Sequence, residues 1–485
     1  MQLQKRQIAG SWVAIGAGLT VLAGLLTLAS PRFGYDVVVR DMPVFWLTAG
    51  LMAAGALFLV LPWLVRKSET LGTARTSTLL TFIVGAGLVM RLILFASEPV
   101  LEDDYQRYLW DGAVSAHGLN PYAAAPEEAK SADPEASPLG RLAVQSGPVL
   151  DRVNHPTLRT IYPPVAQGAF ALAHVIAPFS LAAWRGVILL LDGAALALLL
   201  MLLRDLKRSP LWASLYWWNP IVLKELFNSA HMDAIVVPLV LAGLVLAMRK
   251  RPLAAGVSIL LAAGAKIWPL LLLPLVWRPL AAHPARAAIA LMIAVCATLL
   301  FAAPVLTAGL DQGSGFVAFA QTWKTNSALF PVLEQVSHVA LNLFGAAKID
   351  PGAIVRVMIA FALGLLALWV ARKPFTDAEE LVRRALLMTA TAFLLSPVQF
   401  PWYFLWVLPL LALRPVPGLL LPTATLPLYY SAFYFLARDT YTVFTGVIVW
   451  FIWIPVWALL LFDARHLKSV RNRWWRPSRQ AGQPT

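Results

Sequence analysis

Long apolar runs alternate along this chain with shorter polar connections. A helix of about 20 apolar residues crosses the hydrocarbon core of a bilayer. We therefore predict crossings at residues 8–30, 43–65, 76–97, 184–203, 210–227, 234–248, 287–308, 352–371, 384–398, 402–413, 415–436 and 442–462. The pattern predicts an all-α polytopic membrane protein, with one integral membrane domain over residues 1–485 and about 12 crossings.

Composition supports this class of protein. Hydrophobic residues make up 59% of the chain and charged residues 13%, whereas soluble domains have about 45–50% and 25%. These values exclude a soluble enzyme and a disordered chain. The unbroken apolar runs also exclude an outer-membrane barrel, whose strands alternate between apolar and polar residues.

The net charge of +14 indicates which way the chain is oriented. Lys and Arg collect in the cytoplasmic connections of membrane proteins, so this charge does not require a nucleic-acid partner, and we predict none. With the N-terminus inside, the basic connections and the tail at 463–485 lie in the cytoplasm. Residues 98–183 then lie outside, and we predict a cytoplasmic (inner) membrane protein whose functional face is the periplasm or exterior.

Two apolar segments do not fit as simple crossings. If residues 163–180 crossed, the basic residues at 204–208 would lie outside, so we predict an interfacial helix there. The segment 252–277 has basic residues at both ends. We predict a hairpin broken near Lys266, Trp268 and Pro269, which raises the count to about 14 crossings.

The predicted outer segment 98–183 begins with the acidic sequence LEDDYQRYLWDG. In a helix, Asp104, Tyr108 and Asp111 share one face at i, i+4 and i+7, and Arg107 borders that face. A carboxylate here could act as a general base that accepts a proton from an attacking hydroxyl. The alternative interpretation is an acidic, solvated loop.

Further polar and aromatic residues lie in other predicted outer segments or within the membrane. An ionisable residue at membrane depth indicates a functional site, so Lys266 either contacts a phosphate or pairs with a carboxylate. The aromatic residues are either interface anchors or part of a sugar or isoprenoid surface. The candidates are His155, Arg159, Tyr162, Lys224, His231, Trp323, Lys324, Gln399, Trp402 and Tyr403. No dense metal-ligand motif is present, and Asp103 with Asp104 is the only pair that suggests a divalent metal.

The sequence LEDDYQRYLWDGAVSAHGLNPY followed by IYPPVAQGAFAL resembles the polyprenyl-phosphate-mannose-dependent mannosyltransferases of the type C glycosyltransferase (GT-C) superfamily. The segments NPIVLKELFNSAHMDA, AAGAKIWPLLLLP and SPVQFPWYFLW are also similar to segments of that family. The resemblance implies a GT-C-like bundle whose first large extracytoplasmic loop is catalytic. We assign no role to the two crossings before residue 70, which are not part of the smallest family pattern.

The resemblance also implies an activity. A sugar, expected to be mannose, would pass with inversion from a polyprenyl-phosphate donor to a hydroxyl of a glycolipid, glycan or protein, with membrane lipids as surroundings. Asp104 would be the base, with Asp103 and Glu102 as the neighbouring candidates. Charge on the leaving phosphate would be met by Lys266, Arg159, His231 or Lys224. The remaining candidates would bind substrate: Arg107, Tyr108, Asp111, His155, Tyr162, Trp323, Lys324, Gln399, Trp402 and Tyr403.

Two other functions fit part of the pattern. A lipid or glycan transporter or flippase would also place charges in a helical bundle, but its site would lie at mid-membrane, between repeated halves. A polymerase or ligase of the O-antigen type would use a lipid-diphosphate donor and outer arginines. The outer connections of this chain instead present acidic and aromatic residues first.

Overall fold

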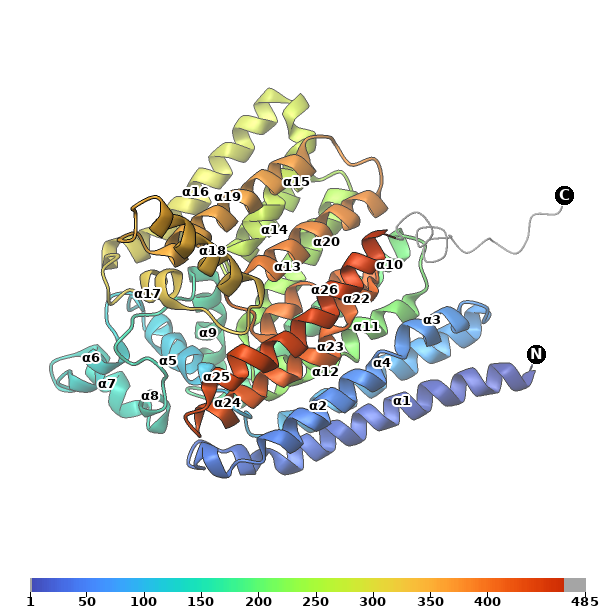
Figure 1. The fold of residues 1–485 in the computed structure, drawn as a ribbon, viewed down its shortest axis with the longest axis horizontal. Helices are drawn as coiled ribbons and strands as arrows, with labels where there is room; N and C mark the ends of the chain where they lie inside the picture. Colours follow the sequence, from blue (N-terminus) through green and yellow to red (C-terminus); the bar gives the residue numbers. More distant parts are fainter. Residues whose placement is uncertain (1, 466–485) are drawn as a thin grey trace.

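The computed structural model describes residues 2–465, and these residues form a bundle of helices (Figure 1). Within this range no β-strand occurs, apart from an isolated bridge between Thr325 and Val398. Among residues 2–465, eight helices are long and apolar enough to span a membrane, which confirms the predicted class. They are Arg6–Phe33, Val44–Ser68, Thr73–Phe95, Leu181–Asp205, Pro284–Ala308, Pro351–Ala371, Pro417–Leu436 and Tyr441–Arg465.

The number of full-length spans is smaller than the sequence predicts. The helices Pro220–Asn228 and Met232–Met248 are bent by 108° relative to one another at a short break. Together they form a ninth span or a re-entrant loop. The segment 401–413 consists of the 3-10 helix η8 (Pro401–Trp406) and the short α21 (Leu408–Leu413). Proline starts both of these elements, and because it cannot continue a preceding helix, an apolar run here becomes short turns.

The predicted hairpin and the predicted interfacial helix both correspond to short elements. Helix α14 (Pro252–Ala263) ends just before Lys266, and the chain packs back against it through η6 (Trp268–Leu272) and α15 (Leu273–Trp277). Helix α9 (Pro164–Ile176) has 13 residues. It is roughly 20 Å long, which is too short for a bilayer core of about 30 Å.

The basic connections of the chain meet at one end of the bundle. Trp12, in α1 (Gln2–Ala29), donates a hydrogen bond to Ser68, where α3 (Leu61–Ser68) ends. Arg208 pairs with Glu379 at 2.9 Å. Helices α5 to α9 lie at the other end, on the left of Figure 1, away from α3. The basic tail predicted at 463–485 lies, from residue 466 on, outside the described residues.

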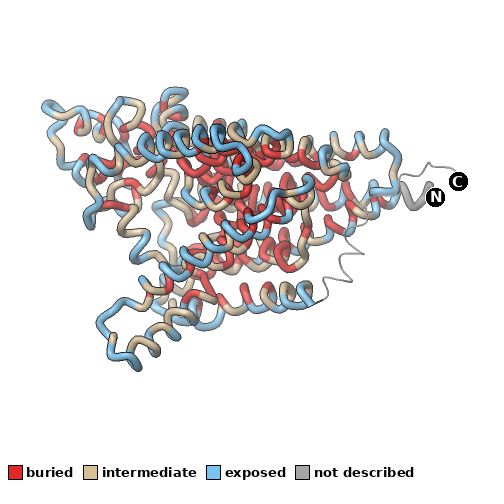
Figure 2. The backbone as a smooth tube through the Cα atoms, turned by 90° about the horizontal axis from the view of Figure 1, so that it is seen from above, coloured by how far each residue is buried: buried red, intermediate tan, exposed pale blue. Residues whose placement is uncertain are grey.

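A buried ion pair joins the helices at the centre of the bundle. Arg91 in α4 (Thr73–Phe95) contacts Asp192 in α10 (Leu181–Asp205) at 2.7 Å, and neither side chain is exposed. Tyr216 donates a second hydrogen bond to Asp192 at 2.6 Å. Removing either partner would leave a buried charge unpaired, so this contact fixes the two helices relative to one another. Figure 2 shows buried residues running through the middle of the bundle.

The first two helices are an integral part of this bundle. The ring of Trp12 contacts that of Trp218 edge to face at 5.7 Å, and Trp12 is fully buried. Helix α2 (Val44–Phe58) packs against the C-terminal elements, where Phe45 contacts Tyr434 at 4.3 Å. The connection between α1 and α2 therefore has a fixed position at the end of the bundle that also holds α5.

Candidate active site

A cavity of about 1210 Å³ lies beside the start of α5 (Asp104–Ala116). Ligand pockets commonly have about 300–1,000 Å³, so this cavity has room for more than one substrate. It collects residues that lie far apart in the sequence. Of the candidates predicted above, it is lined by Glu102, Asp103, Asp104, Arg107, Tyr108, His155, Arg159, Tyr162, Lys266, Trp323, Trp402 and Tyr403.

The acidic cluster, Glu102 to Asp104, is held in a fixed geometry. Glu102 Oε1 accepts hydrogen bonds from the backbone N–H groups of Asp103 and Asp104 at 3.2 and 3.1 Å. Asn154 Nδ2 donates to Asp103 Oδ1 at 2.8 Å and to Asp104 Oδ1 at 2.7 Å. One neutral amide thus orients two adjacent carboxylates, and both of them face the cavity.

Asp104 has additional partners. The hydroxyls of Tyr162 and Tyr108 donate to Asp104 Oδ2 at 3.3 and 3.5 Å. Tyr108 follows Asp104 by one helical turn, as the sequence predicted, because α5 begins at Asp104. Gly112 lets α5 lie close to α9, since a Cβ there would be 2.5 Å from the carbonyl oxygen of Phe170. This close packing brings Tyr162, which precedes α9, to Asp104.

Burial gives the acidic cluster a high proton affinity. Loss of solvent raises the pKa of Glu102 to about 7, with Lys224 opposing the change. Burial and the charges of the two neighbouring acids raise the pKa of Asp103 to about 7. Burial and Glu102 also raise the pKa of Asp104, against the effects of His231, Asn154 and Tyr162. A carboxylate with a raised pKa is a better proton acceptor at neutral pH than an exposed one.

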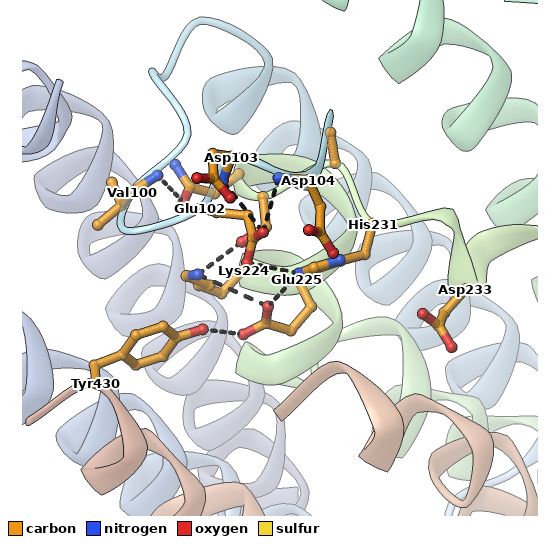
Figure 3. A network of polar contacts seen from close by, with 12 residues as sticks. Val100, Glu102, Asp103, Asp104, Lys224, Glu225, His231, Asp233 and Tyr430 are labelled. Atoms are coloured by element: carbon orange, nitrogen blue, oxygen red, sulfur yellow. Dashed lines mark hydrogen bonds and ion pairs between the residues drawn. The ribbon is translucent and has the colours of Figure 1, made fainter. Parts of the chain in front are cut away.

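A buried polar layer lies behind the acidic cluster (Figure 3). His231 Nε2 lies 3.0 Å from Glu102 Oε2 and 3.5 Å from Glu225 Oε2, and its Nδ1 lies 3.4 Å from the hydroxyl of Tyr108. Lys224 donates to Ser229 at 2.6 Å. Both Lys224 and Glu225 belong to the π-helical turn η4 (Leu223–Asn228).

This layer corrects the predicted position of two phosphate ligands. Lys224 is 2% exposed and His231 is fully buried, and neither lines the main cavity. The π-helical turn and the break after it point both side chains into the protein, towards Glu102. They are placed to support the acidic cluster and not to contact a phosphate in the cavity.

Lys266 forms a different part of the cavity wall. Its Nζ donates to both carboxylate oxygens of Asp233, at 2.7 and 3.0 Å, and it lies 4.1 Å above the ring centre of Tyr403. Trp406 Nε1 donates to Asp233 at 2.7 Å. Lys266 is therefore paired with a carboxylate and also faces the cavity, with one fifth of its side chain exposed. Asp104 is close enough to interact with its charge.

Aromatic rings surround Lys266. Trp406 stacks on Tyr403 with ring centres 4.5 Å apart and on Trp268 at 5.2 Å. Phe400 stacks on Trp402 at 4.1 Å. All five rings line the cavity. This wall combines one cation with a broad apolar surface, an arrangement that suits a phosphate attached to an apolar chain.

Arg107 and His155 shape the loop that carries Asn154. Arg107 donates to the carbonyl oxygens of Asn154 and His155 at 3.1 and 3.0 Å. The ring of His155 lies 4.9 Å from that of Trp323. Arg107 thus acts on the acidic cluster through Asn154, while His155 and Trp323 are part of the cavity wall.

Arg159 and Lys324 are both engaged by carboxylates. Arg159 contacts Asp311 at 2.5 Å and donates to two backbone carbonyls, although it also lines the cavity. Lys324 pairs with Glu334 at 2.9 Å and does not line the cavity. Arg159 also holds the backbone of residues 308 and 309, whereas Lys266 lies among aromatic rings of the cavity wall, so Lys266 is the better placed of the predicted phosphate ligands.

Two further candidates are buried away from the cavity. Asp111 continues the face of Asp104 and Tyr108, but Gln167 donates to it at 3.3 Å and it lies one turn deeper. Gln399 donates to backbone carbonyls at the end of α20 (Ala378–Leu395), at 2.8 and 3.2 Å. Both side chains stabilise the walls of the site.

Sequence reasoning missed several residues of the site. Asn154 lies in a turn-forming sequence, Asn-His-Pro, where a local structural role was the simpler interpretation. Asp233 follows a helix break, and only the fold brings it to Lys266. The connection between α1 and α2 also lines the cavity, at residues 31, 33–37, 39 and 42.

Three residues of the site could hold a metal ion. Glu102, Asp104 and His231 each offer one ligand atom, and these atoms lie within 4.8 Å of one another. This set differs from the predicted pair, because Glu102 and His231, a histidine from a distant segment, take the place of Asp103. Within this set, His231 Nε2 lies 3.0 Å from Glu102 Oε2.

Residues 8–282 match the family model described as "Alpha-(1->6)-mannopyranosyltransferase, N-terminal domain", which covers more than half of the chain. The chain belongs to this family. It is 28% identical over 402 residues to "Alpha-(1->6)-mannopyranosyltransferase A" of Mycobacterium tuberculosis (strain ATCC 25618 / H37Rv), an alignment that covers 78% of this chain and 72% of the relative. No solved structure matches the chain.

The family assignment decides between the functions left open above. The chain is a mannose-transferring glycosyltransferase and a multi-pass membrane protein, rather than a transporter or an O-antigen polymerase. The family model begins at residue 8, so α1 and α2, to which the sequence analysis gave no role, are part of the family's structure.

Proposed function

We propose that this mannosyltransferase moves mannose from a polyprenyl-phosphate donor to a hydroxyl of a glycan acceptor at the extracytoplasmic face. Asp104 and Lys266 carry the proposal, because both side chains line one cavity. The mycobacterial relative is named for an α-(1→6) mannose linkage. We propose the same linkage here.

The proposed reaction is a single displacement with inversion. Asp104 accepts the proton of the acceptor hydroxyl as its oxygen bonds to the anomeric carbon of mannose. The bond from that carbon to the phosphate oxygen breaks, and the phosphate leaves with its electron pair and negative charge. Lys266 stabilises that charge. A base and a cation on different walls of the cavity suit attack and departure on opposite sides of the sugar.

The surroundings of Lys266 favour a lipid-linked donor. The rings of Trp268, Tyr403 and Trp406 provide an apolar surface next to it, on which the first isoprene units of the donor could lie. We propose that no divalent metal takes part, because Asp104 and Lys266 already supply the proton acceptor and the positive charge that the step needs.

The test uses purified protein in vesicles, with radiolabelled polyprenyl-phosphate mannose as donor and octyl α-mannoside as acceptor. We expect a radiolabelled dimannoside whose new bond is α-(1→6) by glycosidase digestion. GDP-mannose in place of the lipid donor should give no product. Transfer from GDP-mannose alone, or no transfer from the lipid donor, would contradict the proposed donor.

The outward face is tested separately by labelling. A cysteine introduced at Lys207, among the basic connections, should stay protected from an impermeant thiol reagent in intact cells. The matched control is a cysteine at Glu135, in the exposed part of the loop that follows α5. Labelling at Lys207 and protection at Glu135 would place the cavity on the cytoplasmic side and overturn that part of the proposal.

A further inference from the structure

The connection between α1 and α2, residues 30–43, forms one wall of the active-site cavity, but the proposed chemical step uses none of its residues. It contains two short helical turns, η1 (Ser30–Phe33) and η2 (Val39–Asp41). Between them, Gly34, Tyr35 and Asp36 line the cavity next to the acidic cluster. We call residues 30–43 the N-terminal wall.

The N-terminal wall is held against the loop that leads to the acids. Ser30 Oγ accepts a hydrogen bond from the backbone N–H of Glu98 at 3.0 Å. The backbone of Gly34 lies so close to Glu98 that a Cβ would be 2.9 Å from its Oε2. At the far end of the wall, Arg438 donates to the carbonyl oxygen of Arg40 at 3.0 Å. These contacts give the wall a defined position over the cavity.

Three side chains of different chemistry lie together at this wall: an aromatic ring, a carboxylate and a guanidinium. The guanidinium of Arg152 lies 4.8 Å above the ring centre of Tyr35 and 3.4 Å from Asp36. Tyr35 is 58% exposed and the Asp36 side chain 86% exposed. An exposed ion pair of this kind contributes little to folding. Their position on the cavity wall suggests a role in binding instead.

The chemistry of the group suits a sugar. A tyrosine ring offers an apolar face for the C–H groups of a pyranose and a hydroxyl at its edge. A carboxylate accepts hydrogen bonds from adjacent sugar hydroxyls, and a guanidinium donates to sugar oxygens with a fixed geometry. The wall near Lys266 is different, because its surface is mainly aromatic and its cation is already paired.

The group also lies next to the proposed base. Arg152 precedes by two residues Asn154, the amide that orients Asp103 and Asp104. Tyr105 interacts with the charges of both Arg152 and Asp103. A sugar bound at this group would therefore lie near the acidic cluster, whereas Lys266 and its ion-pair partner Asp233 belong to another part of the cavity wall.

We propose that Tyr35, Asp36 and Arg152 form the acceptor subsite, which binds a hexose of the acceptor glycan and presents its hydroxyl to Asp104. This inference rests on the proposed function and adds a specific role for the N-terminal wall. The cavity volume of about 1210 Å³ leaves room for donor and acceptor together. The acceptor enters along the N-terminal wall, and the donor occupies the wall of Lys266.

Steady-state kinetics with varied octyl α-mannoside and saturating lipid donor tests this subsite. We expect Tyr35→Ala and Arg152→Gln each to raise the KM for the mannoside about tenfold or more, while the KM for the donor stays within about twofold. Val38→Ala is the matched control, because Val38 is exposed on the same wall and does not line the cavity. It should leave both constants unchanged.

Equilibrium binding separates this inference from the proposed function. Titration calorimetry with octyl α-mannoside alone should show binding to the wild type and to Val38→Ala, and weakened binding to Tyr35→Ala. If the wild type binds the mannoside but transfers no mannose from the lipid donor, the proposed donor fails and the subsite stands. If Tyr35→Ala and Arg152→Gln keep the wild-type KM and affinity for the mannoside, the subsite is overturned. An equal rise in the KM for the donor would overturn it as well.

Discussion

The charged side chains on two walls of the cavity, Lys266 on one and the acidic cluster on the other, are stabilised in different ways. Lys266 is paired directly with Asp233 at 2.7 Å, so its charge is balanced before a substrate arrives. None of the ion pairs formed by residues 2–465 involves Asp103 or Asp104, which are held by a neutral amide and by tyrosine hydroxyls instead. Unbalanced burial raises the proton affinity of the acids, whereas the carboxylate of Asp233 favours the charged form of the lysine.

This contrast suits the acidic cluster and Lys266 to different steps of the reaction. A base must gain a proton during the reaction, and a carboxylate whose pKa is raised by burial does so readily. A group that stabilises a leaving phosphate must stay charged throughout, and a paired lysine meets that need. The following predictions test the two walls separately, in order of expected effect.

Replacing the proposed base should have the largest effect. Asp104→Asn keeps an oxygen that can accept from the tyrosine hydroxyls but cannot take up the proton, so we expect kcat to fall by about 10²–10⁴-fold. Asp103→Asn should reduce kcat much less. Both rates come from the vesicle assay, with circular dichroism to confirm the fold. Near-normal activity of Asp104→Asn would move the base to Asp103 or Glu102.

Replacing Lys266 should have the second-largest effect. Because Lys266→Met alone would leave Asp233 buried without its cation, the test is the double variant Lys266→Met with Asp233→Asn. We expect kcat to fall by about 10²–10³-fold, with the KM for octyl α-mannoside unchanged. Lys324→Met is the control, since Lys324 pairs with Glu334 outside the cavity. An equal loss in that control would argue against a specific role for Lys266.

The pH dependence of kcat/KM should reflect the protonation of the acidic cluster. The base acts only when deprotonated, and burial raises the pKa of Asp104, so kcat/KM should rise with pH over a range above that of an exposed aspartate and then level off. The hydrogen bond from Asn154 lowers the pKa of both Asp103 and Asp104. Asn154→Ala should therefore shift the rise to higher pH. A shift to lower pH, or a flat profile in the wild type, would contradict this assignment.

Chelation should have the smallest effect. Because the proposed step uses only Asp104 and Lys266, we expect EDTA to change the rate by less than about twofold. The readout is transfer from the lipid donor before and after chelation, with and without added Mn²⁺ or Mg²⁺. A large loss that one of these ions restores would show instead that Glu102, Asp104 and His231 bind a metal.

The parts of the site that could be predicted from the sequence are those set by local geometry. Tyr108 lies one helical turn from Asp104 in any α-helix, and the structure shows that helix starting at Asp104. The break near Lys266 follows from proline at position 269. Asp233 could not be paired with Lys266 from the sequence, because 33 residues separate them, including the helices α13 (Val236–Met248) and α14.

The same limit explains the residues that were misplaced. Lys224 and His231 were expected at the cavity because they lie near the end of a predicted outer helix. The structure turns both inward: Lys224 lies in η4, a π-helical turn that rotates side chains relative to an α-helix, and His231 lies in the break after η4. A single extra residue per turn decides whether a cation faces a substrate or supports a carboxylate from behind.

By itself, the sequence determined that this chain is a helical membrane protein with an acidic, aromatic segment that follows the third apolar run. Apolar run length and helical spacing are local properties, and they hold wherever the helix is placed. Only the tertiary structure decided that Asn154 orients the acids, that Asp233 balances Lys266, and that the connection between α1 and α2 forms a cavity wall. These contacts depend on how helices bend and rotate when they pack, which no short stretch of sequence specifies.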